Sequence, residues 1–208
     1  MNRNNIIETE EQLRELYEAP MERAILKQKS ELDKPSKEFI QHSPFLVLST
    51  ISPDGFGDCS PKGDPEGFVE IIDDKTIAIP DRKGNNRLDS LVNITRDPRV
   101  GIIFFIPGRN ETLRVNGNAS ISVDPELLSR LSMQNKTPKV AIIVDVKEAY
   151  FHCPKALIRS DFWIKGANLK DLTTYIKAAK EQLGEDVTKE EISKLAKEYQ
   201  ESLKDRLY

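Results

Sequence analysis

The hydrophobic pattern changes along this chain of 208 residues. Residues 45–51 and 100–106 are apolar runs without a helical period, and residues 112–123 alternate between apolar and polar side chains. Turn sequences rich in Pro, Gly, Asp and Asn separate such runs at intervals of about ten residues. The pattern predicts a mainly β fold with some helix (α+β), in which six or seven strands form a closed antiparallel barrel. The predicted strands are residues 45–51, 58–64, 68–72, 76–79, 100–106, 112–123 and 140–153.

One predicted strand has an unusual composition. Pro61 and Gly63 do not fit the middle of a paired ladder, so residues 58–64 are predicted to form an edge strand or a bulged segment. Such a strand leaves backbone N–H and C=O groups open to a ligand, and flat heteroaromatic rings are bound largely through groups of this kind. An irregular surface loop is the alternative interpretation.

Helical patterns flank the barrel sequence on both sides. Residues 1–43 are predicted to form short packing helices. Residues 166–208 are rich in charges of both signs and are predicted to form a helical hairpin, whose second helix opens with a capping box of Thr188 and Glu191. The chain is therefore divided into N-terminal helices, a barrel domain over residues 44–165, and this charged C-terminal hairpin.

A basic segment follows the fourth predicted strand. Arg82, Lys83 and Arg87 surround Gly84. A helical pattern begins immediately afterwards, over residues 88–94. Cationic side chains beside a glycine, which lets backbone approach closely, are typical of sites that bind a phosphate dianion.

Two asparagines in the same segment are candidates for the helix cap. The side-chain oxygen of Asn85 or Asn86 would accept a hydrogen bond from the first turn of the helix. The remaining free N–H groups and the positive end of the helix dipole would then favour an anion. The alternative is a solvated basic turn that only caps a helix.

Composition excludes several functions. The net charge of −3 and a pI near 5.6 argue against nucleic-acid binding, which normally requires a basic excess. No apolar run approaches the roughly 18 residues of a membrane span, and the polar N-terminus lacks the apolar region of a signal peptide. We therefore expect a cytoplasmic protein in which Cys59 and Cys153 are reduced and serve as small buried side chains. Two histidines make a histidine-rich metal site implausible, so no metal is predicted.

Four motifs occur in an order that identifies a family. The segment from residue 45 to residue 163 resembles the flavin-binding split barrels related to pyridoxamine 5'-phosphate oxidase, particularly a bacterial branch described as FMN-dependent enzymes. The second motif is the specific one. The motifs are Ser60-Pro-Lys-Gly-Asp64, Ile79-Pro-Asp-Arg-Lys-Gly-Asn-Asn-Arg-Leu-Asp-Ser-Leu91, Pro107-Gly-Arg-Asn-Glu-Thr-Leu-Arg-Val-Asn-Gly117 and His152-Cys-Pro-Lys-Ala-Leu-Ile-Arg-Ser160.

The resemblance implies a homodimer that holds FMN in a cleft between two subunits. The basic segment would bind the phosphate, the edge strand would run along the isoalloxazine ring, and Lys62 would stabilise negative charge near N1 and the C2 oxygen. Side chains that follow the last strand would come from the partner subunit and border the open face of the ring. The residues implied to bind the cofactor are Ser60, Pro61, Lys62, Gly63, Asp64, Arg82, Lys83, Asn85, Asn86, Arg87, Lys155, Arg159 and Trp163.

The chain departs from the authentic oxidases at two places. Pro80-Asp81 replaces their Tyr-x-Ser-x-Lys-like phosphate segment, and Ile164 and Lys165 follow Trp163 where those enzymes have the substrate-binding Arg-Leu pair. We therefore expect an FMN-dependent oxidoreductase that does not oxidise pyridoxamine phosphate. Its substrate would be another small molecule, and NADH or NADPH is a candidate electron donor.

Three alternatives remain open at the level of sequence. Related split barrels bind a deazaflavin or haem, and His152 is the candidate axial ligand for haem. A histidine at a strand end that is satisfied by its neighbours is the preferred interpretation of that residue. A non-catalytic flavin-binding or assembly protein, which would use the charged C-terminal helices as an interaction surface, is the third alternative. No catalytic residue is predicted.

Overall fold

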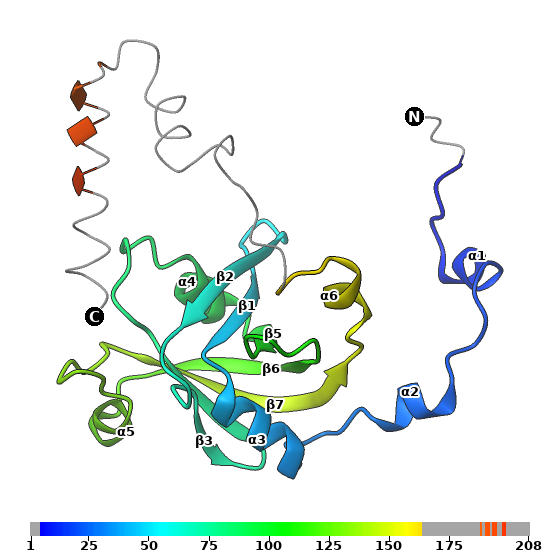
Figure 1. The fold of residues 1–208 in the computed structure, drawn as a ribbon, viewed down its shortest axis with the longest axis horizontal. Helices are drawn as coiled ribbons and strands as arrows, with labels where there is room; N and C mark the ends of the chain where they lie inside the picture. Colours follow the sequence, from blue (N-terminus) through cyan, green and yellow to red (C-terminus); the bar gives the residue numbers. More distant parts are fainter. Residues whose placement is uncertain (1–4, 164–187, 189, 192, 195–196, 199–208) are drawn as a thin grey trace.

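The computed structural model describes residues 5–163, 188, 190, 191, 193, 194, 197 and 198 (Figure 1). Seven strands form one antiparallel sheet in the order β2-β1-β5-β6-β7-β4-β3, which leaves β2 and β3 as its edge strands. The chain thus forms the predicted α+β split barrel, with every predicted strand present and peripheral helices around it. The strands are β1 (Phe45–Ile51), β2 (Gly57–Gly63), β3 (Glu70–Asp73), β4 (Thr76–Pro80), β5 (Arg99–Phe105), β6 (Thr112–Ser122) and β7 (Ala141–His152).

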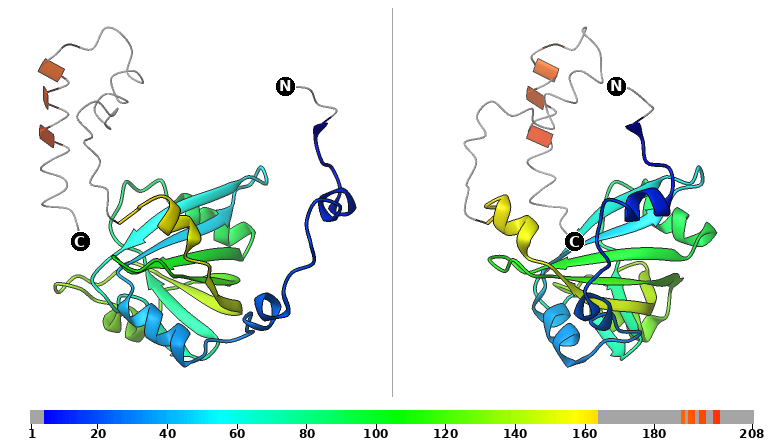
Figure 2. Two further views of the ribbon diagram at one scale, coloured as in Figure 1. Left: turned by 45° about the vertical axis from the view of Figure 1, so that its right-hand side comes forward. Right: turned by 90° about the vertical axis from the view of Figure 1, so that its right-hand side faces the viewer.

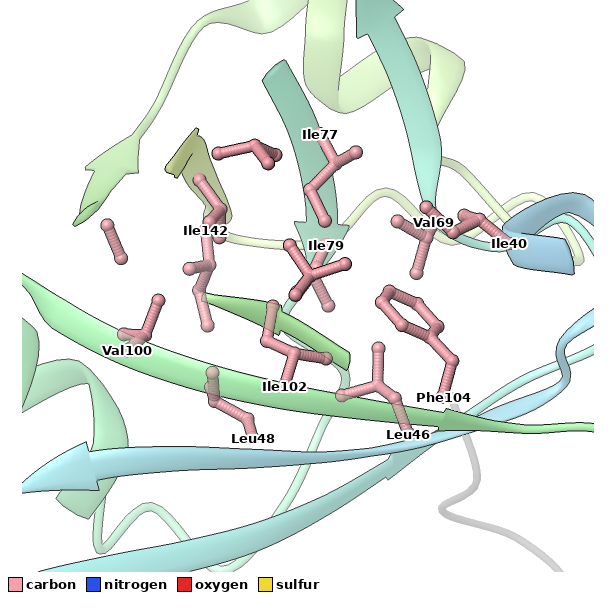
Figure 3. Close-up of a cluster of buried hydrophobic side chains, with 14 of the residues drawn as sticks. Ile40, Leu46, Leu48, Val69, Ile77, Ile79, Val100, Ile102, Phe104 and Ile142 are labelled. Atoms are coloured by element: carbon pink, nitrogen blue, oxygen red, sulfur yellow. The ribbon is translucent and has the colours of Figure 1, made fainter. Parts of the chain in front are cut away.

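Alternate residues of the strands fill the interior. Leu46 and Leu48 of β1 face Ile102 and Phe104 of β5 across the ladder, and all four side chains are at most 1% exposed. Each such side chain contributes about 1.5–3 kcal/mol by leaving water. Figure 3 shows these side chains converging with those of β4 and β7. Burial alternates along β1 and β5 although their outward side chains are also largely apolar, so in these two strands the sheet pairing decides which face is buried. The further core residues labelled there are Ile40, Val69, Ile77, Ile79, Val100 and Ile142.

Six helices occur in the residues described without a break, 5–163. The clearest local signals are acidic caps with proline in the first turn: Asp33 accepts from the Ser36 N–H ahead of α3, and Asp124 accepts from the Glu126 N–H ahead of α5. The helices are α1 (Glu10–Arg14), α2 (Glu22–Leu26), α3 (Lys34–His42), α4 (Asp89–Arg96), α5 (Pro125–Arg130) and α6 (Lys155–Arg159).

The C-terminal hairpin predicted for residues 166–208 falls mainly outside the described residues. The capping box that was predicted to open its second helix is present. The Thr188 N–H donates to Glu191 Oε2 at 2.9 Å, and the Glu191 N–H donates to Thr188 Oγ1 at 3.2 Å. These two bonds satisfy donors that would otherwise be unpaired at a helix start.

Two local predictions are wrong. Neither Asn85 nor Asn86 caps α4, because the helix begins later, at Asp89, and its N-cap Leu88 makes no side-chain cap hydrogen bond. Cys59 and Cys153 are free thiols, but both are exposed rather than buried. Cys59 faces outward because residues of an edge strand alternate between the two faces, and Cys153 follows the end of β7.

Candidate functional site

The edge strand β2 presents a polar inner face. It pairs with β1 on one side only, as the residues Pro61 and Gly63 predicted. Ser60 and Lys62 are half-buried, whereas Pro61 and Gly63 between them are exposed. The strand therefore offers both an unpaired backbone edge and inward-facing polar side chains to a ligand.

Two ion pairs join the end of β2 to the residues that follow β4. Lys62 Nζ lies 3.4 Å from Asp81 Oδ1, and Arg82 Nε lies 2.6 Å from Asp64 Oδ2. The Asp64 side chain is 1% exposed and that of Arg82 16% exposed, so this charge pair is largely removed from water. Breaking a buried pair leaves an uncompensated charge and is strongly destabilising. The pairs therefore hold the basic segment against the edge strand.

The segment between Arg82 and α4 has a strained backbone. The Asn85 side chain accepts a hydrogen bond from the Arg87 N–H at 3.0 Å, which forms a tight local turn. Asn86 and Leu88 both have left-handed backbone, with φ of 62° and 61°. This conformation is uncommon for leucine and costs about 1–3 kcal/mol, and such strain is often found at ligand sites.

The same segment carries two exposed cations. Arg87 is 73% exposed and lies 2.9 Å from Asp89 through its Nε, so its outer guanidinium nitrogens remain open to solvent. Lys83 is exposed and makes no ion pair or side-chain hydrogen bond with any described residue. A Cβ built on Gly84 meets no atom within 4 Å. The segment thus combines exposed positive charge, open space beside a glycine and the start of a helix, which fits a phosphate group.

A buried hydrogen-bond network fixes the helix that follows. Asn93 of α4 is 4% exposed, and its Nδ2 donates to Thr50 Oγ1 and to Asp58 Oδ2, both at 3.0 Å. Thr50 belongs to β1 and Asp58 to β2, so one amide ties α4 to both strands. Sequence reasoning missed this network, because nothing in the spacing of these three residues brings them together. It sets the distance between the basic segment and the edge strand.

Asn93→Ala is expected to lower the free energy of unfolding by about 2–3 kcal/mol, because buried hydrogen-bonding groups lose their donor. Urea denaturation followed by circular dichroism measures the loss. Asn118→Ala, on an exposed position of β6, is the matched control and should stay within about 0.5 kcal/mol of the wild type. Equal stability of the two variants would show that the Asn93 network carries no stabilising role.

The remaining predicted site residues make no hydrogen bond or ion pair with the other predicted residues in the described part of the chain. Lys155 and Arg159 are exposed on α6, and no hydrogen bond or ion pair joins this helix to β2 or to residues 82–88. Trp163 donates through Nε1 to the Arg109 carbonyl at 2.6 Å, which fixes it beside the β5–β6 loop. One copy of the chain therefore brings together ten of the thirteen predicted residues, those on β2 and the basic segment. These ten are Ser60, Pro61, Lys62, Gly63, Asp64, Arg82, Lys83, Asn85, Asn86 and Arg87.

His152, the candidate axial ligand for haem, lies at the end of β7. Its pKa is lowered by partial burial and by the positive charges of Arg114 and Lys27. No group of three or more metal-ligating side chains occurs among the described residues. In the same part of the chain, no helix is long and apolar enough to cross a membrane.

Comparisons with known proteins bear on the barrel. A family model described as pyridoxamine 5'-phosphate oxidase matches residues 32–153, more than half of the chain. No curated protein matches the sequence. Similar solved structures include HupZ of Group A Streptococcus, which is 18% identical with a TM-score of 0.48, the match covering 58% of this chain and 93% of that one.

Two further solved structures show a similar degree of likeness. General stress protein 26 of Bacillus anthracis is 19% identical with a TM-score of 0.43, over 55% of this chain and 88% of that one. An FMN-binding protein of Syntrophomonas wolfei is 12% identical with a TM-score of 0.43, over 69% of this chain and 96% of that one.

Proposed function

Because the chain belongs to the pyridoxamine 5'-phosphate oxidase family, we propose that it is a homodimeric, FMN-dependent oxidoreductase acting on a small molecule. The observation that carries the proposal is the basic, strained segment before α4, held against a polar edge strand by two ion pairs. When bound, FMN would supply the transfer of electrons, and the protein would supply position and electrostatics.

The phosphate of FMN would bind at the basic segment. Lys83 and Arg87 are the cations that can turn toward it, because both are exposed. Arg82 would act differently: its guanidinium is paired with the buried Asp64, so it would shape the segment. Asn85 would support the same shape through its bond to the Arg87 N–H, with Asn86 in the left-handed turn. The helix start then adds backbone donors to the two cations.

The flavin ring would lie along β2, from Ser60 to Asp64. The exposed backbone of Pro61 and Gly63 can approach a flat ring closely. Lys62 would place its ammonium near the pyrimidine edge of the ring, where negative charge increases as electrons are taken up. Asp81, 3.4 Å from Lys62, would hold that ammonium in position and partly offset its charge. Asp81 would therefore be a positioning residue, a role that its place in the second motif did not reveal.

The second subunit would complete the site. Lys155, Arg159 and Trp163 make no hydrogen bond or ion pair with β2 among the described residues of one copy, and the partner would supply them across a cleft. Trp163 would border the ring with its indole, which its bond to the Arg109 carbonyl orients. The substrate would enter at this open face, with NADH or NADPH as the candidate electron donor.

The absorbance spectrum and an FMN titration test the proposal directly. The purified protein should show flavin absorbance or bind added FMN below tens of micromolar, with the change in spectrum expected for a protein-bound ring. Reduction of the bound flavin by NADH or NADPH would then support catalysis. Failure to bind FMN would reject the cofactor, whereas binding without reduction by any donor would favour a flavin-binding protein without catalysis.

Lys62→Met is expected to lower the reduction potential of bound FMN while leaving FMN binding largely intact. The reason is that the variant removes positive charge near the ring edge but leaves the phosphate contacts unchanged. Potentials are measured by equilibration with a reference dye. Lys62→Arg keeps the charge and should stay close to the wild-type potential. A potential that is the same in all three proteins would remove Lys62 from the ring edge.

A further inference from the structure

The first described part of the chain extends away from the barrel. Figure 1 and the left view of Figure 2 show α1 and α2 on a segment that leaves the barrel beside β7 and stands clear of it. We call residues 6–26 the N-terminal arm. Its large apolar side chains are solvent-exposed, with Leu16 at 68%, Tyr17 at 65% and Ile25 at 58%. The other exposed ones are Ile6, Ile7, Leu13, Met21 and Leu26.

This apolar surface is large for a segment whose helix α1 contains no buried residue. None of the α1 residues is buried, although a capping bond from the Gln12 N–H to Thr9 Oγ1 defines where the helix begins. A helix of five residues has too few hydrogen bonds to be stable alone in water, so it requires packing of its apolar side chains. Single exposed apolar residues are ordinary, but a continuous series of them indicates a contact surface.

The residues that follow the arm, Lys27 and Lys29, contact β7 at the edge of one face of the sheet. Lys29 and Ala149 exchange backbone hydrogen bonds of 3.0 and 2.8 Å, and Lys27 Nζ lies 5.4 Å from the centre of the Tyr150 ring. Tyr150 in turn accepts a hydrogen bond from Arg114 at 2.9 Å, and both side chains lie on the outer face of β6 and β7. The arm therefore begins where this outer face ends.

The same outer face carries an apolar strip. Phe45 and Phe105 lie opposite each other, with ring centres 6.0 Å apart, and Val47 lies opposite Ile103 in the next row. Phe45 is 39% exposed, and the other three are half-buried.

Charge supports the match between arm and strip. Residues 6–26 contain six glutamates and two arginines, a net charge of −4. Arg114 lies beside Ile103 in the ladder, and Arg109 lies in the loop that follows β5. Neither arginine forms an ion pair with a described residue. An acidic, apolar arm and an apolar strip bordered by cations are complementary.

We propose that the N-terminal arm of each copy packs on the outer face of a second copy, so that two arms are exchanged in the dimer. The residues that follow the arm contact Ala149 and Tyr150, at the edge of the outer face. Two copies that meet through this face under two-fold symmetry would each therefore extend an arm over the other. This assignment rests on the proposed function only in requiring a homodimer, and it gives the predicted packing helices their partner.

Sedimentation equilibrium of the full chain tests the exchange. Leu16→Asp combined with Ile25→Asp should raise the dimer dissociation constant at least tenfold, because two carboxylates would enter an apolar contact. Val123→Asp combined with Ile72→Asp is the matched control, since these apolar residues are also exposed, at 70% and 44%, but lie away from arm and strip. The control should dimerise as the wild type does. A monomeric wild type, or equal dissociation constants for all three, would overturn the proposal.

Disulfide trapping distinguishes exchange from folding back. Two variants are made in a chain in which Cys59 and Cys153 are replaced by serine. One carries Leu16→Cys, the other carries Val47→Cys, and each has a different tag. The two proteins are then mixed. If the arms are exchanged, a disulfide forms between the two differently tagged copies. A single chain that carries both substitutions and forms the disulfide only within itself would overturn exchange, as would the absence of any disulfide between copies.

FMN titration of the same proteins is an independent measurement. A dimer with exchanged arms that binds no FMN would reject the proposed function and leave the arm assignment standing.

Discussion

Lys83→Ala combined with Arg87→Ala is expected to weaken FMN binding by a factor of about 100 or more and to leave riboflavin binding nearly unchanged. The two ligands differ only in the phosphate, and each charge-assisted hydrogen bond to it is worth about 1.5–3 kcal/mol. Two such contacts amount to about 3 kcal/mol at least, and 1.4 kcal/mol corresponds to a tenfold change in affinity. Fluorescence titration with both ligands, at one fixed salt concentration, measures the difference.

A control must remove the same charge elsewhere. Lys75→Ala combined with Arg130→Ala removes two exposed cations from the region around β3 and the far end of β4. Loss of FMN binding in this control would indicate a general effect of net charge, which salt would screen. Parallel losses for FMN and riboflavin in the Lys83 and Arg87 variant would instead contradict the phosphate assignment.

Arg82 should behave differently from its two neighbours. It is paired at 2.6 Å with a carboxylate that is 1% exposed, so Arg82→Ala would leave Asp64 as an uncompensated buried charge. Loss of FMN binding in that variant would therefore report damage to the segment as well as any lost contact. For this reason the phosphate test uses only the exposed cations, Lys83 and Arg87, whose removal uncovers no buried group.

The strands were predictable because burial imposes a period of two on them. In residues 113–121 the alternate positions that turn inward, Leu113, Val115, Gly117, Ala119 and Ile121, carry no polar side chain, and a shift by one residue would expose them. Pro61 and Gly63 likewise marked β2 as an edge strand, because proline removes a ladder donor. Short-range rules of this kind determine where strands lie and, in β6, which face is buried.

The site was predictable only in part. The cations of the basic segment were visible in the sequence, but the start of α4 was not. Leu88 has left-handed backbone there, and a leucine in the sequence does not indicate that conformation. The pairing of Lys62 with Asp81, and of Asn93 with Asp58, joins residues separated by 19 and 35 positions. Such contacts depend on how strands and helix meet in space, which local patterns do not specify.

Gly117→Ala is expected to lower the free energy of unfolding by about 3 kcal/mol or more, because the added methyl group has no space. Gly117 lies in β6 where its register with β7 shifts, and a Cβ there would lie 2.2 Å from the Asp145 carbonyl oxygen and 3.1 Å from a methyl group of Val144. That oxygen belongs to the backbone of the central strand β7, so it cannot move without disturbing the ladder. Urea denaturation measures the loss.

Gly57→Ala provides the comparison within the same sheet. A Cβ at Gly57 meets no atom within 4 Å, and its position on the edge strand β2 leaves the added methyl group in solvent. This variant should remain within about 1 kcal/mol of the wild type, because alanine also reduces the entropy of the unfolded chain. If Gly117→Ala were as stable as Gly57→Ala, the close approach of β6 and β7 at the bulge would be wrong. That result would also place in doubt the positions of Arg114 and Tyr150, which follow from the register beside it.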